Sequence, residues 1–163
     1  MTQTDTPSPQ AARQKWMAVL ARASEQELAD GLAALPTLPE AEVLRAPETG
    51  LVMVRGRAGG DGDAFNLGEM TVTRCAIRLG AHIGHAYIAG RNHAKARLAA
   101  LLDAALQDAA LHDAVMQAVV EPLSTAQQEA RAIEARKAAA TRVDFFTMAN
   151  GAARHGHLTQ VEG

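Results

Sequence analysis

Residues 70–79 read MTVTRCAIRL, and this stretch has the composition and side-chain alternation of a β-strand. Successive side chains of a strand point to opposite faces of its sheet. One face would therefore carry Thr71, Thr73, Cys75, Ile77 and Leu79, and the other Val72, Arg74, Ala76 and Arg78. The second face thus bears two arginines.

Four further segments are predicted to be strands. They are residues 42–46, 50–57, 64–67 and 85–89, separated by turn-forming residues at 47–50, 58–62, 66–68 and 80–84. Because these connections are short, neighbouring strands should pair antiparallel. We expect a β meander of four to five strands.

Two helices are predicted before the meander. Ser8 followed by proline is a typical helix start, and apolar residues then recur at intervals of three and four. Ser24 and Glu27 form a capping box that would begin a second helix, which Pro36 would end.

Three more helices are predicted after the meander. Apolar periodicity indicates helices over about 92–108 and 111–122, and Ser124 would cap a final helix that reaches about Met148. Strands grouped in the middle, with helices at both ends, indicate an α+β fold.

A chain of 163 residues is long enough for one domain. We expect a disordered start at 1–8, a single domain with an extended C-terminal helix at 9–150, and a flexible tail at 151–163. Aromatic residues make up only 3% of the chain and alanine is abundant, so the core should be thin. A thin core favours a protein that completes its stability against a partner.

Composition also excludes several classes of function. The formal net charge of −2 argues against nucleic-acid binding. Cys75 is the only cysteine, which rules out an internal disulfide and a thiolate cluster. No apolar run approaches the length of a membrane helix, and residues 1–10 do not resemble a signal peptide. We expect a cytoplasmic protein that binds neither nucleic acid nor membrane.

Arginines on the predicted strands form one candidate site. Arg55 and Arg57 follow Leu51 and Met53 on one face of their strand, and could align beside Arg74 and Arg78. Arginine makes forked contacts with phosphate and carboxylate groups. The four residues Arg55, Arg57, Arg74 and Arg78 are therefore possible anion ligands, although solvated or salt-bridged arginines on an open sheet face would give the same pattern.

Histidines form a weaker candidate site. His82 and His85 have a spacing seen in metal sites, and His93 is close in sequence, but no cysteine or carboxylate nearby completes a ligand set. The glycine-rich segment 58–62 lacks the lysine of a phosphate loop, and no serine lies in a nucleophile-elbow sequence. We assign no catalytic residue, no metal site and no cofactor.

The end of the final helix differs from the rest of it. Between 123 and 140 the only large apolar residue is Ile133, after which a cluster of four follows. The cluster consists of Val143, Phe145, Phe146 and Met148. It could fold back onto the sheet or form an interface with a partner chain.

Five segments of the chain resemble the PhnG family of carbon–phosphorus lyase subunits. They read RQKWMAVL at 13–20, RAPETGLV at 45–52, FNLGEMTVTRC at 65–75, GHAYIAGR at 84–91 and ATRVDFFTM at 140–148. They occur in the family's order, and the resemblance extends over roughly residues 11–150.

The resemblance implies an accessory subunit that assembles with the H, I and J subunits of the lyase core, especially I, and with the ATPase-like L subunit. The complex attaches an alkylphosphonate to ribose C1 of ATP and displaces adenine. The I subunit is regarded as carrying this transfer, and J, a radical iron–sulfur protein, later breaks the carbon–phosphorus bond. No catalytic residue of the family's G subunit is carried over to this chain.

Two alternatives follow from the residues themselves. The chain could bind the anionic substrate directly through its strand arginines. It could also be a small stand-alone metal enzyme that uses His82 and His85.

Overall fold

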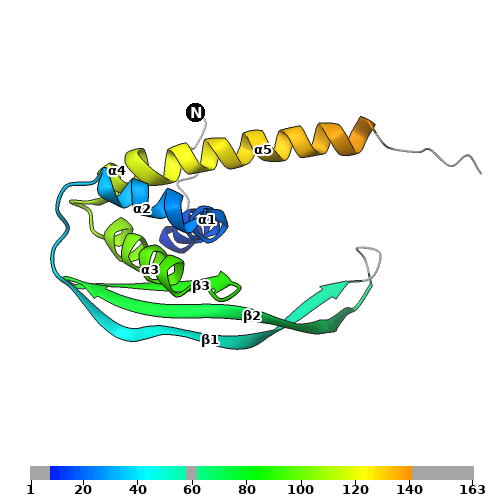
Figure 1. Ribbon diagram of the computed structural model, residues 1–163, viewed down its shortest axis with the longest axis horizontal. Coiled ribbons are helices and arrows are strands. Elements are labelled where there is room, and N and C mark those ends of the chain that lie inside the picture. Colours follow the sequence, from blue (N-terminus) through cyan, green and yellow to red (C-terminus); the bar gives the residue numbers. More distant parts are fainter. Residues whose placement is uncertain (1–7, 58–61, 141–163) are drawn as a thin grey trace, which may run out of the picture.

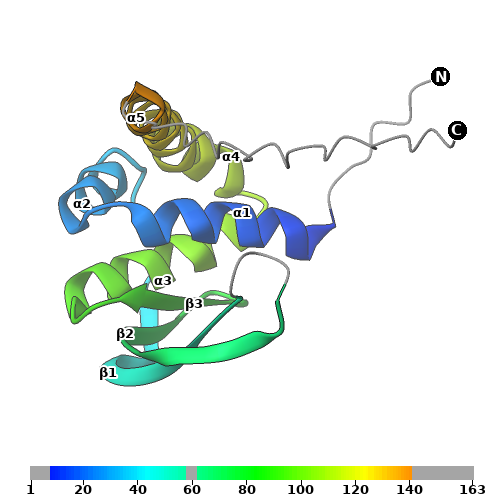
Figure 2. The same cartoon turned by 90° about the vertical axis from the view of Figure 1, so that its right-hand side faces the viewer.

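The computed structural model describes residues 8–57 and 62–140. The helices are α1 (Pro9–Arg22), α2 (Glu25–Ala33), α3 (His93–Gln107), α4 (His112–Val115) and α5 (Glu121–Ala140), with a π-helical turn, η1 (Met116–Val120), between the last two. The strands are β1 (Ala41–Arg57), β2 (Ala64–Leu79) and β3 (His82–Ala89). This is the α+β fold predicted from the sequence: helices come before and after an antiparallel sheet along the chain, and all of them lie over one face of it (Figures 1 and 2).

The elements stack in layers (Figures 1 and 2). The sheet forms the base, α3 lies on one of its faces, α1 and α2 lie above α3, and α5 runs across the top. Among the described residues, no helix is both long and apolar enough to cross a membrane. Residues 1–7, the tail at 151–163 and the apolar cluster at 143–148 lie outside the described residues.

Within the described residues the sheet has three strands in the order β1-β2-β3, so the predicted count of four to five strands is wrong. The segments 42–46 and 50–57 are one strand, because register shifts on either side of Arg45 absorb the residues of the predicted turn. Pro47, which cannot donate a ladder hydrogen bond, is tolerated because β1 is an edge strand.

Strand β2 was also predicted as two pieces, and glycine explains the difference. Residues 66–68 do not form a turn but a bulge, since Val54 pairs with Gly68 while Arg55 pairs with Asn66. Gly68 has φ 150°, a conformation that residues with side chains rarely adopt. The chain therefore continues as a strand through a sequence that has the composition of a turn.

The segments α4, η1 and α5 follow one another without a break, which the sequence did not predict. Pro122 was expected to end one helix and Ser124 to begin the next, but both lie in the first turns of α5. Proline lacks the N–H that the helical ladder requires. The π-helical turn η1 directly precedes Pro122, with the Glu121 N–H bonded to the Met116 carbonyl, and interrupts the regular ladder at that point. Ser124 instead accepts a hydrogen bond from Gln128.

Alanines let α3 lie very close to the sheet. Ala96, Ala99, Ala100 and Ala104 are fully buried on this helix. Opposite them stands Gly84 of β3, where a Cβ atom would overlap the Ala100 carbonyl oxygen and the Ala104 main-chain nitrogen. The alanine-rich composition therefore provides close packing of backbones rather than a large apolar volume.

Larger side chains complete the core around this contact. Those with almost no exposed surface include Leu20, Leu28, Ile77, Leu79, Ile88, Leu102, Leu106, Val115 and Val119. Cys75 is buried with them, and burial raises the pKa of its thiol. Thr73, on the same face of β2, is satisfied by donating to the Gly90 carbonyl at 2.7 Å.

The outer half of the β1–β2 hairpin extends beyond β3. Strand β3 pairs only with residues 72–79 of β2, whereas residues 64–71 pair with 51–57 of β1 alone. We call these two segments, 51–57 and 64–71, the ribbon. Figure 1 shows that the ribbon projects past α3.

The contact at Gly84 gives a stability prediction. Gly84→Ala places a methyl group against the α3 backbone, which cannot retreat without disturbing its alanine packing, and should reduce the free energy of unfolding by about 3 kcal/mol. Chemical denaturation of the isolated chain measures this loss. Gly50→Ala is the matched control, because a Cβ there meets no atom within 4 Å, and it should change stability by less than about 1 kcal/mol. Equal effects of the two variants would contradict the close approach.

Candidate functional site

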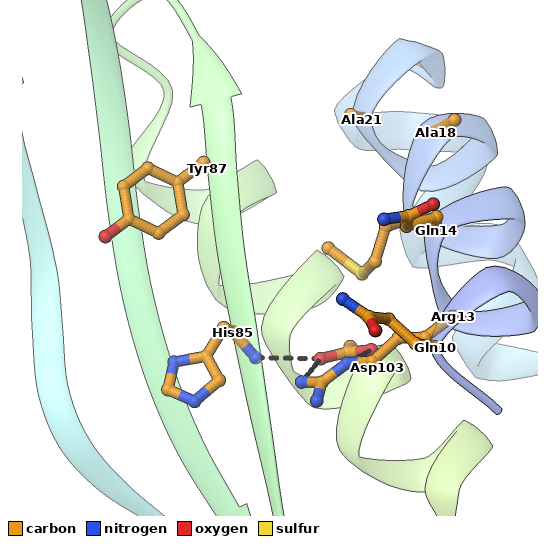
Figure 3. Close-up of a pocket in the computed structure, with 9 residues that line it drawn as sticks. Gln10, Arg13, Gln14, Ala18, Ala21, His85, Tyr87 and Asp103 are labelled. Carbon is orange, nitrogen blue, oxygen red and sulfur yellow. Dashed lines mark hydrogen bonds and ion pairs between the residues drawn. The ribbon is translucent and has the colours of Figure 1, made fainter. Parts of the chain in front are cut away.

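A buried carboxylate joins three elements next to a surface groove. Asp103 of α3 has a side chain that is only 1% exposed. Its oxygens accept four hydrogen bonds: from Arg13 Nε at 3.1 Å, Arg13 Nη2 at 2.6 Å, the Trp16 indole N–H at 2.9 Å and the His85 main-chain N–H at 2.9 Å. Figure 3 shows Asp103 between Arg13 and β3.

This set of donors explains how an acid is tolerated in the core. Removing a charge from water is costly unless it is paired and hydrogen-bonded. Here the forked Arg13 guanidinium supplies the opposite charge with bidentate geometry, and two neutral donors engage the same carboxylate. The carboxylate is thus fully occupied, which leaves it unsuited to act as a general base.

The ion pair also fixes the start of strand β3. Arg13 Nη2 donates to the Ile83 carbonyl at 3.2 Å, and Gln107 Nε2 donates to the same carbonyl at 2.9 Å. Together with the bond from His85 to Asp103, these contacts hold the outer edge of β3 against α1 and α3. The sequence contained one signal for this hub that was not recognised: Asp103 is the only charge in the apolar run LAALLDAALQ at 98–107.

A groove of about 580 Å³ runs between α1 and the outer edge of β3. From α1 it is lined by Gln10, Arg13, Gln14, Met17, Ala18 and Ala21, from β3 by His85 and Tyr87, and from α3 by Asp103. Figure 3 shows α1 on one side and β3 on the other, with the His85 and Tyr87 rings projecting from the strand on the side away from α1. The main chain of β3 therefore forms one wall of the groove.

The pattern of hydrogen bonds shows which groups of β3 face this groove. The Gly90 N–H donates to the Thr71 carbonyl, so the even-numbered residues of β3 bond to β2. The odd-numbered residues point the other way, as the outward bonds of Ile83 and His85 confirm. Tyr87 and Ala89 continue this outward series, and within the described residues their main-chain groups have no hydrogen-bond partner on that side.

Two basic side chains are bonded to main-chain carbonyls of residues that line the groove. The Arg22 guanidinium donates to the Ala18 carbonyl at 3.1 Å, and Lys95 Nζ donates to the Ala21 carbonyl at 2.9 Å. Burial lowers the pKa of Lys95, while the nearby Glu27 carboxylate acts in the opposite direction. The pKa of Glu27 is itself lowered, because it accepts hydrogen bonds from Ser24 in the capping box.

The four strand arginines do not gather into one site. Arg74 pairs with Glu48 at 2.7 Å and Arg78 with Glu42 at 2.9 Å, both across the sheet on exposed side chains. Arg55 instead lies opposite Asn66, eight residues from Arg74 along β2, which corresponds to about 26 Å.

The other two strand arginines, Arg55 and Arg57, lie at the end of the ribbon. Arg55 donates to the Ala64 carbonyl at 3.4 Å, and Arg57 to the Gly62 carbonyl at 3.1 Å. The register therefore separates two arginines at the tip of the ribbon from two on the part of β2 that pairs with β3. Anion binding by any of them stays a prediction.

The three candidate histidines lie on two elements, β3 and α3. His82 begins β3, His85 lies within it, and His93 at the start of α3 is hydrogen-bonded to Thr49 at 3.0 Å. In the described part of the chain, no three His, Cys, Asp or Glu side chains are grouped so that they could hold a metal ion.

The buried ion pair gives a second stability prediction. Asp103→Ala leaves Arg13, the Trp16 indole and the His85 N–H without their acceptor, so the free energy of unfolding should fall by about 3–5 kcal/mol. Chemical denaturation is the measurement. Asp113→Ala removes an exposed acid from α4 and should change stability by less than about 0.5 kcal/mol. A loss at Asp103 no larger than that at Asp113 would show that the hub is not a structural requirement.

Comparisons with known proteins agree with the resemblance found in the sequence. The family model for the phosphonate metabolism protein PhnG matches residues 11–151. A relative from Rhizobium meliloti (strain 1021), the alpha-D-ribose 1-methylphosphonate 5-triphosphate synthase subunit PhnG, is 45% identical over 142 residues, which cover 86% of this chain and 90% of the relative. The chain belongs to the PhnG family of phosphonate metabolism proteins.

Proposed function

We propose that this chain is a subunit of an alpha-D-ribose 1-methylphosphonate 5-triphosphate synthase and acts in carbon–phosphorus lyase phosphonate metabolism. The similarity to the Rhizobium meliloti subunit over nearly the full length of both proteins supports this role. Its role in the complex is accessory. The complex transfers an alkylphosphonate to ribose C1 of ATP with displacement of adenine, and its use of ATP is consistent with a cytoplasmic location.

The exposed ribbon is the observation that carries the subunit role. Its large apolar side chains lie in water: Leu51 is 63% exposed and Leu67 is 61% exposed. Met53, Phe65 and Met70 of the ribbon are exposed as well. Several large exposed apolar side chains gathered in one segment are typical of protein–protein interfaces.

Both faces of the ribbon carry exposed apolar side chains. Residues that pair directly across two antiparallel strands share a face. Leu51 pairs with Thr71, and Thr71 shares its face with the buried Thr73, so Leu51 and Met53 extend the helix-covered face of the sheet. Met70 pairs with Val52 and therefore lies on the opposite face.

A two-stranded ribbon has little stability of its own in water. The described part of this chain does not bury the apolar side chains on either face of the ribbon, which stay in contact with water. We therefore infer that neighbouring subunits enclose the ribbon from both sides.

The partners follow from the family. We propose that the H, I and J subunits, especially I, surround this chain, and that the ATPase-like L subunit joins the assembly. The transfer chemistry is assigned to I. This assignment agrees with the groove of the present chain, where the buried Asp103 carboxylate is fully engaged by donors.

The apolar cluster of Val143, Phe145, Phe146 and Met148 is proposed as a second contact with a partner. It follows α5, which ends its described length at Ala140 and is exposed along most of that length. Direct binding of substrate by the strand arginines is less well supported, because an anion would have to displace Glu48 from Arg74 and Glu42 from Arg78.

The ribbon interface can be tested with surface substitutions. The double variant Leu51→Gln/Leu67→Gln removes exposed apolar groups, so the melting temperature of the isolated chain should change little. Recovery of the chain with its co-expressed synthase subunits should fall about a hundredfold or more, since burying each leucine contributes about 1.5–3 kcal/mol.

Ile133→Gln is the matched control. This residue is 43% exposed on α5, away from the ribbon, and its replacement should leave assembly at the wild-type level. Assembly that is unaffected by the ribbon variant would refute the proposed interface.

A further inference from the structure

We propose that the outer edge of β3 receives an extended segment of another synthase subunit, which adds a strand to the sheet inside the groove beside α1. The segment would carry an acidic side chain near its contact with Arg22 and Lys95. This inference rests on the proposed function and adds to it a particular mode of attachment that is independent of the ribbon.

Open main-chain groups on β3 are the first observation. The N–H and C=O of Tyr87, which lines the groove, and the N–H of Ala89 point away from β2 and have no hydrogen-bond partner among the described residues. An exposed strand edge of this kind is a template for another chain. Main-chain hydrogen bonds then supply affinity for an extended peptide.

The hub at Asp103 limits where such a strand can pair. It already occupies the N–H of His85, and Arg13 and Gln107 occupy the carbonyl of Ile83. The pairing edge therefore begins beyond the His85 N–H and runs to the end of β3. Because the hub holds this edge in place, the incoming segment meets a strand that is already ordered.

The opposite wall leaves space for a peptide. Ala18 and Ala21 of α1 line the groove, and because their side chains are short, they leave space between the helix and the strand. Met17 adds an apolar contact beside them. A groove of about 580 Å³ with a strand edge on one side and a helix on the other matches the form of peptide sites that work by strand addition.

Charge indicates which segment would fit. The Arg22 guanidinium lies at the Ala18 carbonyl and Lys95 at the Ala21 carbonyl, so two basic groups are bonded to residues that line the groove. Asp103 is the only acid among the lining residues, and Arg13 neutralises it. An acidic side chain on the incoming segment would thus meet complementary charge.

Amide hydrogen exchange is the deciding experiment. The full chain is measured alone, and after assembly with its co-expressed synthase subunits. Exchange of the Tyr87 and Ala89 amides should slow at least tenfold in the assembly only. Unprotected amides at both positions in an assembled complex would overturn the proposal and leave the subunit role intact.

A pair of variants at one position separates strand pairing from simple burial. Tyr87→Pro removes the outward N–H without removing a bond to β2, and an edge strand accepts proline at such a position. Tyr87→Ala retains that N–H. Assembly of the proline variant should fall at least tenfold below that of the alanine variant. Equal assembly of the two, even with protected amides, would show that side-chain burial and not strand addition covers the edge.

The remaining outcomes are also decisive. If the proline variant fails to fold, exchange in the wild-type assembly decides alone. Protection that appears in the isolated chain and rises with its concentration would assign the edge to a second copy of this chain and overturn the proposal. If the wild-type chain does not assemble with the synthase subunits at all, the proposed function falls together with this inference.

The acidic side chain can be tested with one more matched pair. Arg22→Glu reverses the charge beside the groove and should weaken assembly at least fivefold. Arg131→Glu is the control, because Arg131 also donates to the carbonyl four residues earlier but lies on α5. Equal effects of the two reversals would contradict an acidic residue beside Arg22.

Discussion

The four hydrogen bonds to the Asp103 carboxylate connect α1, α3 and β3, and the position of each of these elements depends on them. A buried acid with this many donors can be satisfied in only one arrangement of its surroundings. Arg13 and Trp16 fix α1 over α3, while the His85 N–H fixes the strand edge. The same contact that stabilises the helical layers also sets the shape of the groove beside them.

Alanine and glycine provide the second constraint. Because α3 presents buried alanines to Gly84, helix and sheet approach so closely that little apolar volume lies between them. Such a core covers only the inner half of the long β1–β2 hairpin. The ribbon beyond it keeps apolar residues in water on both faces, which is the physical basis for treating the chain as one part of a larger assembly.

The sequence was sufficient to predict the fold class, the first two helices and the alternating faces of β2. It overestimated the strand count, because Pro47 and Gly68 are residue types that favour turns but here lie in β-bulges. A bulge is defined by the register with the partner strand, which the local sequence does not reveal. The Asp103 hub was missed for a related reason. Arg13 and Asp103 are 90 residues apart, and no local pattern predicts that they pair. For the strand arginines the local pattern was misleading. Their alternation along the strands suggested that all four lie close together, but the register of β1 and β2 places them apart.

The central claim is that this chain contributes to a phosphonate transferase without catalysing the transfer itself. Adenine release from ATP and methylphosphonate tests it most directly, measured for the isolated chain, for the synthase subunits without it, and for the two recombined. The account predicts no release by the chain alone, strongly reduced release by the subunits without it, and recovery on recombination. Release by the isolated chain, or full activity in its absence, would contradict the account.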